Sequence, residues 1–115
     1  MGKQSLSLHN RAISLFLEKL RTLDELYLLA LGDQPQLWVS VAYFRTEEDC
    51  RIGHSGTLDI ILNIECSDPG HKAALILLKT VYLEAANALG FNHLAFTVNG
   101  KADFLYPTCW AIESL

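Results

Sequence analysis

The chain has 115 residues, of which half are apolar and 19% are charged, and its formal net charge at pH 7 is −4. This length suits a single domain over residues 1–115, and the apolar fraction is high enough to form a folded core. Its nine Lys and Arg residues are scattered along the chain. The composition therefore excludes the basic stripe that nucleic acids and anionic membrane surfaces require.

Apolar runs and cysteines indicate the compartment. The longest apolar runs, such as residues 73–78, reach six residues, whereas a membrane-spanning helix needs about 20. The N-terminus shows no apolar segment with a small-residue cleavage site, as a secretory signal would. Cys50, Cys66 and Cys109 are an odd number at wide spacing, which is typical of reduced thiols. We expect a cytoplasmic protein without a disulfide framework.

Apolar residues at steps of three and four predict a first helix over about residues 6–31. Ser5 or Ser7 can cap its start, and Gly32 stands where a left-handed residue commonly ends a helix. The apolar face is too wide, and the heptad pattern too short, for a coiled coil. We therefore expect this helix to lie on a sheet.

Two strands are predicted next, at Leu37–Phe44 and Thr57–Cys66, separated by a polar loop. The second strand alternates cleanly, because its even-numbered residues are apolar and its odd-numbered residues include Asp59, Asn63 and Glu65. Such alternation is typical of an antiparallel sheet with one solvated face. We expect the odd-numbered residues to form that outer face.

A second helix begins with Ser67 or Asp68 as its cap and Pro69 in its first turn, and it ends at Gly90. Between these limits it is apolar almost all round, with only a thin polar stripe. Such a helix must be covered on more than one side. The first helix and the sheet can provide this cover, or a second subunit can.

A final hairpin is predicted, with strands at His93–Val98 and residues 102–106 around the turn Asn99-Gly100. A two-residue loop would set the apolar residues of the last strand on the wrong face, so we predict a three-residue loop. The residues that this loop aligns on one face are Leu94, Phe96, Ala102, Phe104 and Tyr106.

The predicted order is α-β-β-α-β-β, which describes an α+β two-layer sandwich. Two helices are expected to pack on one face of a mainly antiparallel four-stranded sheet. Residues 108–112 can add a short fifth strand at the C-terminus. The order of the strands in the sheet does not follow from the pattern.

Two Cys and His pairs, Cys50 with His54 and Cys66 with His71, have the residue types of a zinc site. His54 precedes the second strand and Cys66 ends it, so the pairs are separated by about 30 Å of extended chain. One zinc ion needs all its ligands within about 2.3 Å. We expect no metal site and no cofactor.

Other patterns do not predict catalysis either. Asp59 and Glu65 share a strand face, but about 20 Å of extended chain separates them, too far for a carboxylate pair. His54 and Ser55 are neighbours in an extended segment and lack the pattern of a hydrolase nucleophile. Their loop also lacks the glycine fingerprint of a phosphate-binding loop. We expect no catalytic residue.

The outer face of the sheet is the remaining candidate for a binding surface. It presents aromatic rings among hydrogen-bonding groups, a mixture that suits a ligand floor or the core of a protein interface. The alternative is that the long loop or the C-terminal segment covers these rings. The candidate binding residues are Trp38, Phe44, Asp59, Asn63 and His93.

Two functions fit this pattern. The first is a non-enzymatic protein-interaction module that acts as a homodimer, because a short chain has difficulty covering both an apolar helix and an apolar outer face. The second is a small-molecule-binding protein or a small enzyme that uses the outer face. There the two aromatic rings would stack on the ligand, and Asp59, Asn63 and His93 would orient it.

Overall fold

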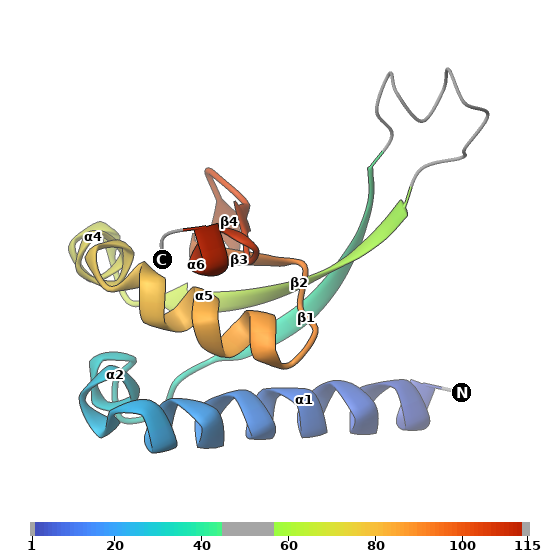
Figure 1. Ribbon diagram of the computed structural model, residues 1–115, viewed down its shortest axis with the longest axis horizontal. Helices are drawn as coiled ribbons and strands as arrows, with labels where there is room; N and C mark the ends of the chain where they lie inside the picture. Colours follow the sequence, from blue (N-terminus) through green and yellow to red (C-terminus); the bar gives the residue numbers. More distant parts are fainter. Residues whose placement is uncertain (1, 45–56, 114–115) are drawn as a thin grey trace.

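The computed structural model describes residues 2–44 and 57–113 (Figure 1). Within these residues the chain forms an α+β fold with helices on a sheet, as the sequence predicts, and the sheet has five strands. The bounds of the first three predicted strands are confirmed. In chain order the elements are α1 (Gly2–Leu23), α2 (Glu25–Ala30), β1 (Leu37–Phe44), β2 (Thr57–Cys66), α4 (Pro69–Leu77), α5 (Lys79–Ala88), β3 (His93–Val98), β4 (Lys101–Ala102), β5 (Tyr106–Pro107) and α6 (Trp110–Glu113).

Strand β2 lies in the interior of the sheet, with β1 antiparallel on one side and β3 parallel on the other. Both β4 and β5 pair antiparallel with the far side of β3, at its two ends. The parallel pair needs a long crossover, which α4 and α5 provide. The sheet is therefore mixed, with one parallel pair among antiparallel ones.

Each of the two predicted helices is divided by a local break. Asp24 leaves the helical conformation after α1, and its carboxylate accepts a hydrogen bond from Leu26 N at 3.0 Å, which starts α2. The second helix breaks at Leu78, which separates α4 from α5. Asp68 caps α4 as predicted, accepting from His71 N at 2.8 Å. No helix in the described ranges is long and apolar enough to cross a membrane.

The core lies between the helices and one face of the sheet. Phe16 and Leu20 of α1 and Tyr82 of α5 are fully buried there against the even-numbered residues of β2 and β3. Helix α5 contacts α1 on one side and α6 on the other (Figure 1). The chain itself thus covers α5, the second half of the predicted helix, whereas Leu77 of α4 is 86% exposed. A second subunit was one of the expected covers of this helix.

Tyr82 also ties two helices together. Its hydroxyl donates to the Tyr27 carbonyl oxygen at 2.7 Å, which joins α5 to α2. The Tyr82 ring packs edge-on against Tyr27 and Phe96, with centroids 6.0 and 6.1 Å away. Burial raises the pKa of the Tyr82 phenol, so this side chain stays a neutral hydrogen-bond donor.

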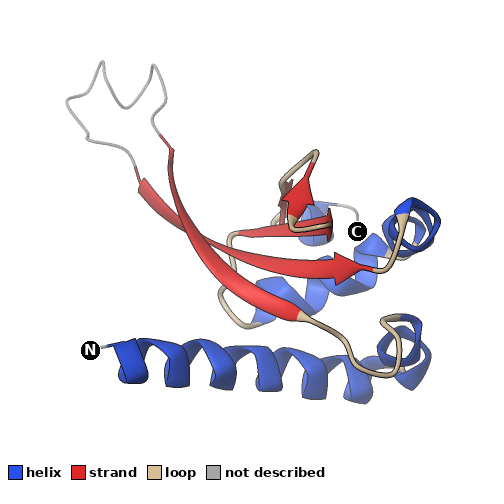
Figure 2. Ribbon diagram, turned by 180° about the vertical axis from the view of Figure 1, so that it is seen from behind, coloured by secondary structure: helices blue, strands red, loops and turns tan. Residues whose placement is uncertain are grey.

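Residues 41–44 of β1 and residues 57–60 of β2 form a two-stranded arm that curves away from α1 (Figures 1 and 2). On the arm, Val41 and Ile60 belong to the sheet face that packs against the helices. Even so, 55% of Val41 and 41% of Ile60 are exposed. The apolar face of the sheet therefore extends beyond the part that the helices bury.

The β3–β4 hairpin has a two-residue loop, so the predicted three-residue loop is wrong. Val98 pairs directly with Lys101. Asn99 and Gly100 both have positive φ, 55° and 76°, as a type I′ turn requires. Asn and Gly adopt this conformation more readily than other residues, which favours the tight turn.

An extra residue enters the ladder after this turn. Between Ala102 and Tyr106, three residues stand opposite two residues of β3, which is the pattern of a bulge. The bulge returns Tyr106 to the core face opposite Leu94, as predicted, whereas Ala102 lies opposite Thr97 on the outer face. The sequence analysis correctly predicted that this hairpin contains an extra residue, but it placed that residue in the turn instead of in the bulge.

The predicted fourth strand at residues 102–106 is divided into β4 and β5 by the bulge. The prediction that residues 108–112 can add a fifth strand is wrong. The chain instead forms α6 at Trp110–Glu113. The Trp110 ring packs against Phe104 and Tyr106, with centroids 5.9 and 6.3 Å away. These ring contacts attach the C-terminal turn of helix to the edge of the core.

Glu65 of β2 holds the β3–β4 turn. Its carboxylate accepts hydrogen bonds from Thr97 Oγ1 at 2.6 Å, Asn99 N at 2.9 Å and Gly100 N at 3.1 Å. The Thr97 hydroxyl first, and then the two amides, lower the pKa of Glu65 below its ordinary value of 4.5. The turn is therefore stabilised by an ionised carboxylate from the neighbouring strand.

This arrangement predicts a pH dependence of folding. Because the pKa of Glu65 is lower in the folded chain, the ionised carboxylate stabilises the fold above pH 4.5, and this contribution is lost as pH falls through the folded pKa. We expect Glu65→Gln to lower stability at pH 7 by about 1 kcal/mol. The variant should also lose less stability in acid than the wild type does.

Urea unfolding from about pH 7 to about pH 3 measures both effects. Glu84→Gln, at an exposed position of α5, is the matched control because it removes the same charge away from the turn. Parallel pH curves for the wild type and Glu65→Gln would contradict the role of the carboxylate.

Candidate functional site

The outer face of the sheet carries the residues that the sequence proposed as a binding surface. The register places Trp38 opposite Asn63 and puts Asp59 and His93 on the same face. Phe44 stands at the end of β1, and its side chain lies outside the part that the structure describes. The four described candidates therefore share one face, across β1, β2 and β3.

This face is less exposed than its alternation suggests. Ile61, Asn63, Ala95 and Thr97, on the interior strands β2 and β3, are between 0% and 7% exposed. The expectation of a solvated outer face is therefore wrong for the centre of the sheet. Polar side chains on this face contact one another from strand to strand, as Asn63 does with Ser40 and Thr97 with Glu65.

Asn63 links β2 to β1. Its side-chain Nδ2 donates to Ser40 Oγ at 2.9 Å and to the Trp38 carbonyl oxygen at 3.3 Å. A buried amide requires such partners, since an unpaired one costs about 1–3 kcal/mol. The group that was expected to orient a ligand thus uses its donors within the sheet.

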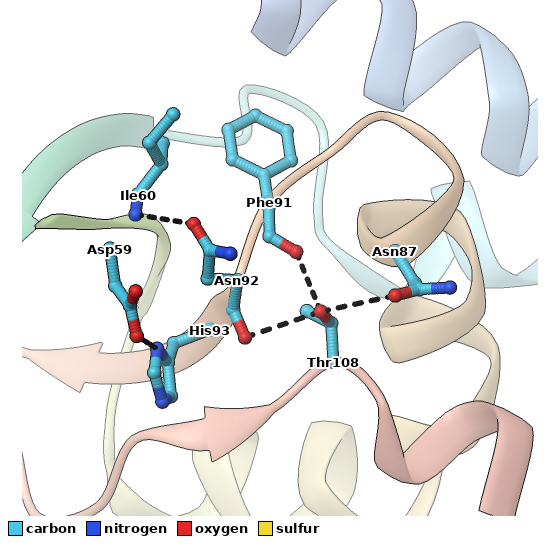
Figure 3. Close-up of polar contacts among 7 residues, drawn as sticks. All are labelled: Asp59, Ile60, Asn87, Phe91, Asn92, His93 and Thr108. Atoms are coloured by element: carbon cyan, nitrogen blue, oxygen red, sulfur yellow. Dashed lines mark hydrogen bonds and ion pairs between the residues drawn. The ribbon is translucent and has the colours of Figure 1, made fainter. Parts of the chain in front are cut away.

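Asp59 and His93 make a second contact between strands, from β2 to β3 (Figure 3). His93 Nδ1 lies 3.3 Å from Asp59 Oδ2, and the two side chains are 17% and 19% exposed. In a catalytic triad, an imidazole beside a carboxylate activates a nucleophilic hydroxyl. The hydroxyl drawn in this cluster, that of Thr108, is buried and donates to the Phe91 carbonyl oxygen at 2.6 Å.

Asn92 and Thr108 hold the start of β3 in place (Figure 3). The Asn92 side-chain oxygen accepts from Ile60 N at 2.8 Å, and Asn92 N donates to the Ile60 carbonyl oxygen at 2.9 Å. Thr108 N in turn donates to the Asn92 carbonyl oxygen at 3.0 Å. These bonds join β2, the turn after α5 and the end of β5, and they position His93 beside Asp59.

A cavity of about 490 Å³ lies at the carboxyl end of β2, beside the loop of residues 31–36. His71 lies in its wall with both ring nitrogens engaged. Nδ1 accepts from Ser67 N at 3.0 Å, and Nε2 lies 2.9 Å from the Ala30 carbonyl oxygen. Cys66 is 1% exposed, and burial raises the pKa of its thiol. Cys66 and His71 therefore help to fix the connection between β2 and α4.

Only half of the zinc-like set can be placed. Cys50 and His54 lie outside the described residues. Cys66 Sγ lies 3.8 Å from the Ile64 carbonyl oxygen, and His71 has the contacts given above. Among the residues that the structure describes, no three His, Cys, Asp or Glu side chains gather as metal ligands do.

A smaller cavity of about 170 Å³ is an apolar groove beside the arm. All the residues that line it are apolar or glycine. We call it the arm groove, and its walls include Ala12 of α1, Val39 and Val41 of β1, Ile60 of β2, and Leu89 and Phe91 at the end of α5.

The sequence reasoning missed the arm groove because its walls come from four separate segments of the chain. One signal was available. Residues 34–44, which include all of β1, have no charged side chain, whereas β2 carries Asp59 and Glu65. A strand without charge at the edge of a sheet is unusual, because edge strands generally carry charges that prevent further pairing.

Comparison of the chain with protein-family models, with curated proteins and with solved structures finds no match. The geometry of the outer face, the arm and the arm groove is therefore the basis for a functional proposal.

The contact of Thr108 with Phe91 predicts a stability effect. Thr108→Val removes a hydroxyl that donates to a carbonyl oxygen, with little change of shape. We expect the free energy of unfolding to fall by about 1–3 kcal/mol. Thr80→Val, at an exposed position of α5, is the control and should change it by less than about 0.5 kcal/mol. Equal stabilities of the two variants in urea would show that the Thr108 hydroxyl does not hold β3.

Proposed function

We propose that the protein is a non-enzymatic interaction module that acts as a homodimer. The observation that carries this proposal is the arm groove together with the two exposed side chains at its walls, Val41 and Ile60. Both residues lie on the sheet face that is buried by helices elsewhere in the molecule. Covering them in a complex would remove apolar surface from water, which stabilises the complex by about 25 cal/mol for each Å² covered.

Single exposed apolar residues are common on protein surfaces and need no explanation, but grouped ones mark interaction sites. Leu26 and Leu29 are 69% and 66% exposed on α2, at the other end of the molecule from the arm (Figure 1). Leu29 also borders a hollow, of about 400 Å³, but the walls of that hollow include the charged residues Arg21, Glu25 and Asp33. The arm groove has only apolar and glycine walls, which suit a protruding apolar side chain. We therefore assign the interaction to the arm.

The polar contacts of the outer face support a structural role for the residues that the small-molecule hypothesis uses. Asn63 bonds to β1, and Asp59 contacts His93. A ligand that needed these groups would have to compete with contacts that hold the strands together. The interaction hypothesis requires no such competition.

A second copy of the chain can meet this surface without bringing like charges into contact. The chain carries a formal charge of −4, so two copies repel each other. That repulsion is weakest if they meet through uncharged surface, and residues 34–44 form the uncharged segment at the arm. A partner selected by charge would instead need charged groups at this surface to recognise.

The test is the molar mass of the native protein, measured by size exclusion with light scattering from about 1 μM to about 1 mM. We expect a mass near twice the 12.8 kDa of the chain at the upper end, with dissociation on dilution. The mass of a single chain at every concentration would contradict the proposal.

A further inference from the structure

We infer that two copies of the chain join through the open edges of their β1 strands, which pair antiparallel and make one continuous sheet. This inference rests on the proposed homodimer and names its interface. It follows from the direction of the backbone groups of β1, from the composition of this strand and from its ability to pair with itself.

Within the described residues, β1 pairs with β2 and with no other strand. Glu65 N donates to the Gln36 carbonyl oxygen at 2.9 Å, just beyond the end of β1. Hydrogen-bonded and non-hydrogen-bonded pairs alternate along an antiparallel ladder. The backbone of even-numbered residues therefore points to β2, and that of odd-numbered residues points away. The residues with outward N–H and C=O groups are Leu37, Val39, Val41 and Tyr43.

The opposite strand supports this assignment. Ile60 stands opposite Val41, so its backbone should also point away from the β1–β2 pair. It does, because Ile60 N and O both bond to Asn92 on the side of β3. The alternation thus holds from the start of β1 into the arm.

An edge strand is normally protected by charged residues, proline or a bulge. The eight residues of β1 include no Asp, Glu, Lys, Arg or Pro. All eight pair with β2 in an unbroken register, so the strand has no bulge. Such an edge can accept another strand along most of its length.

The strand also complements a second copy of itself. When identical strands pair antiparallel about a two-fold axis, residues of the same parity face each other, so the same sheet face is continued. An axis at Ser40 or Val41 leaves the most residues paired. Val39 and Val41 of the two copies then meet on the face of the arm groove, and no like charges oppose each other.

Val41→Pro tests the backbone pairing. Because Val41 N points away from β2, proline at this position removes an outward donor and leaves the hydrogen bonds between β1 and β2 in place. We expect the dissociation constant of the dimer to rise at least about tenfold. Circular dichroism and thermal unfolding report whether the variant remains folded.

Val41→Lys tests the same edge without a backbone change. It places two like charges close together at the two-fold axis, and we expect a monomer at concentrations where the wild type is a dimer. Leu29→Lys is the matched control, because Leu29 is similarly exposed on α2, at the other end of the molecule from the arm (Figure 1). The control variant should dimerise as the wild type does.

The outcomes separate this inference from the proposed function. A monomeric wild type contradicts the homodimer itself. A wild-type dimer that persists in folded Val41→Pro and Val41→Lys variants overturns the β1 interface and leaves the homodimer standing. Dissociation by Leu29→Lys alone would place the interface on α2 and also overturn the inference. If Val41→Pro does not fold, the Val41→Lys and Leu29→Lys pair decides.

Discussion

A β-strand forms hydrogen bonds on two sides, and this fold depends on β2 using both. The backbone N–H and C=O groups of its odd-numbered residues point to β1. Those of its even-numbered residues point to β3 and Asn92. Side chains of the even set enter the core, while those of the odd set lie on the outer face. One strand thereby contributes to both the core and the outer face and places β1 and β3, on which β4 and β5 in turn pair. Among the residues that the structure describes, β1 has a strand partner on one side, and its other side presents a row of backbone groups that no described strand pairs with.

The polar residues of the outer face belong to this same framework. Asn63 connects β2 to β1, Asp59 contacts His93 on β3, and Glu65 holds the turn that follows β3. These contacts explain why polar side chains can lie near the centre of the sheet with little exposure. We therefore place the proposed interaction on the arm, where apolar surface is exposed beside an uncharged edge.

The sequence predicted what depends on local patterns. The period-two alternation of residues 57–66 determined both the bounds of β2 and its two faces. The errors lie where distant residues decide. The bulge at residues 103–105 lies where Lys72 of α4 bonds to Asp103 at 2.6 Å, a contact that no local pattern reveals. The arm groove likewise forms only when α1, the arm and the end of α5 come together, so the site residues chosen from alternation alone lay on the other face.

Amide hydrogen exchange in β1, followed by NMR in dilute and concentrated samples, tests the open edge most directly. In the concentrated sample we expect the amides of Val39 and Val41 to become protected and to lose this protection on dilution. The amides of Ser40 and Ala42, which face β2, should be protected in both samples. Rapid exchange of Val39 and Val41 in a sample that light scattering shows to be dimeric would contradict pairing through β1.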